Sequence, residues 1–100
     1  MDIMKMMKQA KELQSRMKAT QDELAKKEFT GSSGGGSVSV SVKGDFSVSA
    51  VKIKPEVLKE NDHELLEDLV FSAMSQAIES AKSVSQEEMG KLSGMMNLPF

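Results

Sequence analysis

The chain has 100 residues, which is the length of one domain and leaves no room for a second. Of these residues 39% are hydrophobic and 28% charged, a mixture typical of a globular protein. It has no cysteine for disulfides or thiolate metal sites, no apolar run near the ~20 residues of a membrane span, and no apolar signal core at its start. The net charge of −2 is uneven, because residues 1–54 carry 10 Lys and Arg against 6 Asp and Glu, while residues 55–100 carry 3 against 9.

Residues 2–27 are expected to form one long helix, uninterrupted by Gly or Pro. Its apolar positions repeat at the alternating spacing of three and four that is typical of a coiled-coil seam: Ile3, Met6, Ala10, Leu13, Met17, Thr20 and Leu24. Such a helix is just under about 40 Å long, more than a small sheet can cover. Part of the seam is therefore expected to face a second copy of the chain; a helix packed wholly within its own domain is the alternative.

Residues 28–54 are expected to form a small antiparallel sheet of about three strands. Val38, Val40 and Val42 alternate with serines, which gives one apolar and one polar face. Residues 28–31 are expected to add a third, shorter strand, and residues 32–36 are expected to be a flexible connection.

The next strand is expected to return through a two-residue turn at Gly44-Asp45, with the glycine supplying the positive φ of a tight hairpin. Phe46, Val48 and Ala50 resume the alternation. Val51 falls out of phase with this alternation, and a β-bulge near Ala50-Val51 is the simplest way to bring it onto the apolar face.

Residues 61–85 are expected to form a second helix, begun by a capping box of Asn61 and Glu64. Its wide apolar stripe is expected to cover the valine face of the sheet: Leu65, Leu66, Leu69, Val70, Ala73, Met74, Ala77, Ile78 and Ala81. Gly90 and Gly94 are expected to break the helix and leave residues 90–100 as a hydrophobic tail. The order of elements predicts a single α+β domain over residues 1–100.

Few residues suit catalysis. His63 is the only histidine, and no second soft ligand lies near it in the sequence. Glu64, Glu67 and Asp68 lie where carboxylates complement a helix dipole. The glycine run lacks the Lys-Ser/Thr ending of a phosphate loop. We expect no enzyme activity, no metal, no cofactor, no small-molecule substrate and no membrane contact.

The basic residues of the first helix are the stronger lead. The basic residues that lie off the apolar seam are Lys5, Lys8, Lys11, Arg16, Lys18, Lys26 and Lys27. Acidic residues interrupt them, and an ordinary solvated helix face is the alternative interpretation. In a dimer, two such helices side by side would double the field.

In order and spacing, four stretches of the chain resemble the YbaB/EbfC family of small bacterial nucleoid-associated proteins: MKQAKELQSRM, FTGSSGGGSVSVSVKGDFSVSAVKIKPEVL, LLEDLVFSAMSQAIESAK and GMMNLPF. The cytoplasm is the default location of a chain without an apolar signal core. The resemblance implies a nucleoid-associated homodimer that binds double-stranded DNA with little base specificity. It also implies protruding helices that approach the duplex, and a role in nucleoid organisation and gene regulation.

Joined to the charge asymmetry, the resemblance singles out Lys8, Lys11, Arg16 and Lys18 as phosphate contacts, with Lys5, Lys26 and Lys27 as second choices. The alternative function is a structural or protein-interaction homodimer without direct DNA binding.

Overall fold

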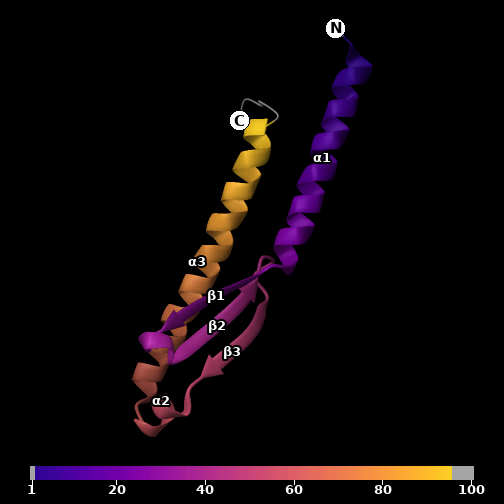
Figure 1. The fold of residues 1–100 in the computed structure, drawn as a ribbon. Helices are drawn as coiled ribbons and strands as arrows, with labels where there is room; N and C mark the ends of the chain where they lie inside the picture. Colours follow the sequence, from indigo (N-terminus) through magenta and orange to yellow (C-terminus); the bar gives the residue numbers. More distant parts are fainter. Residues whose placement is uncertain (1, 96–100) are drawn as a thin grey trace.

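The computed structural model describes residues 2–95. The chain forms a long helix α1 (Ile3–Lys26), three strands, and a second long helix α3 (His63–Met95) (Figure 1). The strands are β1 (Glu28–Ser33), β2 (Val38–Lys43) and β3 (Val48–Ile53), and a 3-10 turn η1 (Gly34–Gly36) and a short helix α2 (Pro55–Lys59) complete the connections. The expected α+β order of helix, antiparallel sheet and helix is confirmed.

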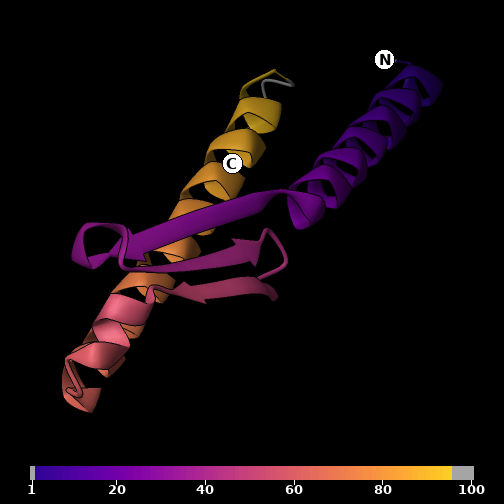
Figure 2. The ribbon, with the colours of Figure 1, turned by 60° about the horizontal axis from the view of Figure 1, so that its bottom comes forward.

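The sheet is antiparallel in the order β1-β2-β3, and it lies across one face of α3 (Figure 2). Val38, Val40 and Val42 of the central strand are fully buried against α3, while the serines between them face the other side. The alternation of valine and serine therefore predicted the correct faces. β1 is longer than expected and runs through Ser33, so the flexible connection shrinks to the three glycines of η1 and Ser37.

Small residues bring α3 close to the sheet. Ala73, Ala77 and Ala81 are buried along the line of contact. Gly31 of β1 packs on the same line, where an added Cβ would lie 2.1 Å from the carbonyl oxygen of Ala73. The packing is therefore helix backbone against strand backbone, and it needs no large aromatic core.

The hairpin between β2 and β3 differs from the expected two-residue turn. Its loop has three residues, closed by hydrogen bonds from the Phe46 N–H to the Lys43 carbonyl (2.8 Å) and from the Lys43 N–H to the Ser47 carbonyl (2.8 Å). The positive φ of 68° belongs to Phe46 and not to Gly44. Gly44 is required for a different reason, since a Cβ there would lie 1.8 Å from the carbonyl oxygen of Leu24.

The β-bulge is also displaced from its expected position. The register shifts between Ser41 and Val42, because Ser41 pairs with Ala50 and Val42 pairs with Val48. The extra residue is thus Ser49. Beyond it Val51 and Ile53 pair with core valines and turn toward the inner face, as the phase change in the sequence required.

α3 begins later and ends later than expected. Asp62, not Asn61, caps it, because its carboxylate accepts from the Leu65 N–H at 3.1 Å. Asn61 instead adopts a positive φ of 54°. The helix continues through Gly90 and Gly94, since a lone glycine lowers helix stability by only about 1 kcal/mol and does not remove a hydrogen bond. Of the expected tail, residues 96–100 lie outside the described part of the chain.

Candidate nucleic-acid interface

The candidate interface is α1, which projects from the body of the molecule (Figure 1). Asp2 caps its first turn by accepting from the Lys5 N–H at 3.3 Å. At its other end Leu24 is only 8% exposed, and Thr20, Leu24 and Lys27 line a hollow with Glu88 of α3. α1 is therefore fixed at its base, and its N-terminal end extends past the last described turn of α3 (Figure 1).

All of the basic residues singled out from the sequence are exposed to solvent: Lys5, Lys8, Lys11, Arg16, Lys18, Lys26 and Lys27. Among residues 2–95 the ion pairs within 4 Å are those that Lys91 makes with Glu87 and Glu88, so the cations of α1 are not held in salt bridges. Lys27 differs from the rest, because its ammonium lies 5.9 Å from the centre of the Phe29 ring.

At about 100° per residue, the cations divide into two groups around the helix. Lys8, Lys11 and Lys18 fall within an arc of about 80°, and this arc also holds Met4. Lys5 and Arg16 lie about 60° and 80° beyond Lys8, at the other side of this arc, together with Glu12 and Glu23, which reduce the local potential there.

Lys11 has the most favourable surroundings for an anion. Its neighbours three and four positions away are Met7, Lys8, Gln14 and Ser15, with no acid among them. Met4, Met7, Lys8 and Lys11 together line a hollow of about 250 Å³. The structure thus brings Lys8 and Lys11 together beside Met4 and Met7, and Lys18 continues along the Lys11 side of the helix.

The acidic start of α3 lies at the other end of the molecule. Figure 1 shows α3 beginning beside α2, far from the N-terminus of α1. Glu64, Glu67 and Asp68 are exposed there and face no cation of α1. The fold therefore keeps the charge asymmetry of the sequence as a separation in space, which leaves the free end of α1 accessible to a polyanion.

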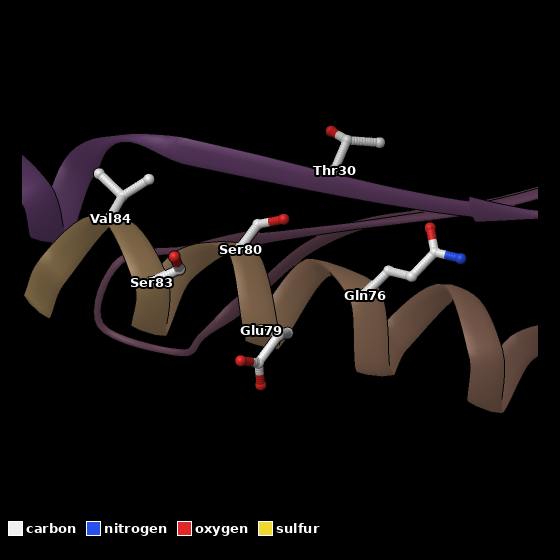
Figure 3. Close-up of a pocket in the computed structure, with 6 residues that line it drawn as sticks. All are labelled: Thr30, Gln76, Glu79, Ser80, Ser83 and Val84. Atoms are coloured by element: carbon white, nitrogen blue, oxygen red, sulfur yellow. The ribbon is translucent and has the colours of Figure 1, made fainter. Parts of the chain in front are cut away.

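A larger hollow, of about 490 Å³, lies between β1 and α3 and is lined by Thr30, Gln76, Glu79, Ser80, Ser83 and Val84 (Figure 3). Gln76 reaches toward the strand, and its amide oxygen accepts from the Ser32 N–H at 3.2 Å. Glu79 points away from Thr30. This arrangement satisfies one N–H group, that of Ser32 in the edge strand β1, and brings no general base to a hydroxyl.

Within the described residues, no group of three or more His, Asp or Glu side chains is placed to hold a metal ion. His63 is exposed beside α2, where it lines a small cleft with Val57 and Leu66. Among those same residues, no helix is both long and apolar enough to cross a membrane.

Comparison with known proteins gives consistent results. The model of the YbaB/EbfC DNA-binding family matches residues 1–96. A nucleoid-associated protein of Desulfotalea psychrophila is 48% identical over 99 residues, covering 99% of this chain and 93% of its own. A nucleoid-associated protein of Clostridium kluyveri is 45% identical over 94 residues, covering 94% of this chain and 82% of its own.

The fold is similar to that in a crystal structure of an uncharacterized protein from Helicobacter pylori. The two share a TM-score of 0.77 at 20% identity, with 92% of this chain and 97% of the other covered. At this identity the likeness speaks for the fold alone.

Proposed function

This chain belongs to the YbaB/EbfC DNA-binding family, and from that premise we propose that it binds double-stranded DNA as a homodimer, with low sequence specificity, through phosphate contacts from α1. The observation that carries the proposal is the exposed arc of Lys8, Lys11 and Lys18 on a helix that projects from the body. Arg16 is a further contact, and Lys5, Lys26 and Lys27 are peripheral ones. A role in nucleoid organisation and gene regulation follows from binding of this kind.

Phosphate contacts explain low specificity. Lysine ammonium groups on an exposed helix contact the phosphate backbone of DNA, which has the same charge in every base sequence. Recognition of bases instead needs side chains placed at base edges. The acidic start of α3 contributes no contact, because Glu64, Glu67 and Asp68 repel phosphate. The net charge of −2 makes the binding modest, and the phosphate contacts make it sensitive to salt.

The dimer is supported by apolar surface that the single chain leaves uncovered. Val48 and Val51 of β3 pair with buried valines of β2 and so face the inner side of the sheet, yet they are 53% and 50% exposed. α3 packs under β1 and β2 and leaves β3 overhanging. The inner side of β3 therefore needs a cover that another copy can supply.

The flank of α3 beside β3 is apolar as well. Gln76 and Glu79 lie on the flank that faces the free edge of β1, so residues on the opposite flank of the helix lie on the β3 side. These are Met74 and Ile78, which are half-buried, and Phe71, which is exposed. Together with Val51 they form an apolar surface suited to a second copy.

The test is the affinity for unrelated duplexes from low to physiological salt. A Lys8/Lys11/Lys18→Ala variant should bind all duplexes more weakly, and the slope of log affinity against log salt should fall by about one unit for each phosphate interaction that the substitutions remove. The matched control is Lys52/Lys59/Lys82→Ala, which removes the same charge from exposed positions outside α1 and should keep the slope.

Equal binding by wild type and Lys8/Lys11/Lys18→Ala would place the DNA-binding surface elsewhere, and equal weakening in both variants would reduce the effect to net charge. Absence of wild-type binding at every salt concentration would leave the protein-interaction homodimer as the function.

A further inference from the structure

Two methionines share the lysine side of α1. Met4, Met7, Lys8 and Lys11 are spaced i, i+3, i+4 and i+7, so they form one stripe along the helix, and they line one hollow. Met4 is 80% exposed and Met7 is 57% exposed. Large apolar side chains on a cationic, solvent-facing stripe are not explained by the packing of the chain.

The seam does not explain Met4 either. Met6 and Leu24 are 18 residues apart, which is five full turns, so Met6 points in the direction of the buried Leu24 and continues the seam. Met4 and Met7 lie about 160° and 100° around the helix from Met6. A partner helix packed on the seam would leave Met4 uncovered.

Resting on the proposed function, we infer that Met4 and Met7 enter the major groove of the bound duplex and contact thymine methyl groups, while Lys8 and Lys11 reach the flanking phosphates. The major groove is about 12 Å wide and admits a helix, whereas the minor groove, at about 6 Å, does not. Its floor carries one apolar group, the thymine 5-methyl, and its rims are anionic. The stripe has the complementary chemistry: two apolar groups followed by two cations.

Methionine suits a contact of low specificity. Its side chain is unbranched and rotates about three bonds, so it can reach a methyl group at more than one position along the groove. It has no strong donor or acceptor for base edges. The contact therefore adds a mild preference for thymine without defining a site.

An anionic membrane surface shares part of this chemistry, but the stripe fits it less well. A helix that lies in a bilayer interface needs an apolar face along much of its length. Here the apolar part spans Met4 to Met7, about one turn, and Lys11 and Lys18 continue along the same side. Short apolar length with cations behind it favours a groove bounded by phosphates.

Uracil substitution tests the contact directly, because it removes the 5-methyl group and keeps base pairing. The full chain is titrated with an A·T-rich duplex and with the same duplex in which every thymine is replaced by uracil. Wild type should bind the uracil duplex more weakly, by about fourfold for each buried methyl group that the substitution removes. Met4/Met7→Gln should bind both duplexes equally, with the salt slope of wild type.

Met6→Gln is the matched control, since it makes the same change at the same end of α1 but on the seam. It should keep the preference for thymine. Binding of anionic phosphatidylserine vesicles, compared between wild type and Met4/Met7→Gln, is measured in parallel and should be absent.

The outcomes separate the two proposals. Salt-dependent wild-type binding with equal affinity for the thymine and uracil duplexes would overturn the methionine contact and keep the proposed function. Loss of the preference in Met6→Gln but not in Met4/Met7→Gln would also overturn it, as would vesicle binding that depends on Met4 and Met7 without a uracil effect. Failure of wild type to bind either duplex at low salt would overturn the proposed function itself.

Discussion

At the scale of single residues, the glycines divide into those held by a close neighbour and those in open space. A Cβ on Gly44 would lie 1.8 Å from the Leu24 carbonyl oxygen, where the hairpin meets the end of α1, whereas a Cβ on Gly90 would meet nothing within 4 Å. Gly44→Ala should lower the free energy of unfolding by at least about 2 kcal/mol, because backbone must move. Gly90→Ala should raise it by about 0.5–1 kcal/mol, since alanine is the better helix former. Urea denaturation of both variants checks this, and equal effects would contradict it.

The same hairpin contains the carboxylate of Asp45. The side chain of Ser47 donates to it at 2.5 Å and the Ser47 N–H donates at 2.9 Å, and these two bonds hold the pKa of Asp45 below its usual value of 3.8. A lowered carboxyl pKa adds stability that is present above the usual value and is lost as the pH falls through the lowered one. The turn should therefore weaken only in acid.

Removing the hydrogen bond from the Ser47 side chain, the larger of the two causes, should return the pKa of Asp45 part of the way to its usual value. In Ser47→Ala the pKa of Asp45 should rise toward its usual value, as measured by NMR titration of the carboxyl carbon. Ser49→Ala is the control, because the Ser49 hydroxyl donates to the Ser41 carbonyl and not to Asp45. An unchanged titration in Ser47→Ala would refute this account of the turn.

At the scale of elements, the alternation in β2 gives a sharp test. Val40→Asp places an unpaired charge in the fully buried centre of the sheet and should lower the free energy of unfolding by about 4 kcal/mol. Ser39→Asp, one residue away, should lower it by less than about 1 kcal/mol, because it faces outward directly opposite Lys52. Denaturation of the two variants decides the matter, and comparable losses would mean that the serine face is buried by a partner.

The elements that sequence reasoning found are those governed by strong periodicity: α1, the valine strand and the apolar stripe of α3. Its errors at two glycines have different causes. Gly44 was assigned a turn conformation, but its reason is the approach of Leu24, which is remote in sequence. Gly90 was expected to end a helix that continues to Met95. The reason at Gly44 cannot be read from neighbouring residues, whereas the one at Gly90 is local, because a lone glycine lowers helix stability by only about 1 kcal/mol.

For the candidate site, the sequence predicts exposed cations on α1; their exposure is confirmed, and their contact with phosphate stays a prediction. Helical spacing in the sequence places Lys8, Lys11 and Lys18 within one arc of α1 and Arg16 beside Glu12. What the sequence lacked was the direction of the body of the molecule, which the burial of Leu24 supplies. Once that direction is known, Met4 and Met7 can be assigned to a side of α1 that faces away from the body of the molecule.

At the scale of the whole molecule, the chain is elongated, at 70 × 20 × 16 Å, and its radius of gyration of 19.6 Å exceeds the ~13 Å of a compact domain of about 100 residues. Two projecting helices and an overhanging strand expose apolar surface that a second copy could bury. We therefore expect a dimer at micromolar concentration, with Val51 of β3 at the interface and the Leu13 side of the seam as a second contact.

Val51→Glu should convert this dimer to a folded monomer. Because Val51 is 50% exposed in the single chain, a carboxylate there stays in water once the copies separate, whereas in the dimer it would be buried without a partner. Lys52→Glu, next to it on the outer face of β3, changes the charge more and should leave the dimer intact. Sedimentation velocity gives the mass and circular dichroism confirms that helices remain. A dimer that survives Val51→Glu but dissociates in Leu13→Glu would move the interface to the seam of α1, and a wild-type monomer at micromolar concentration would remove the dimer altogether.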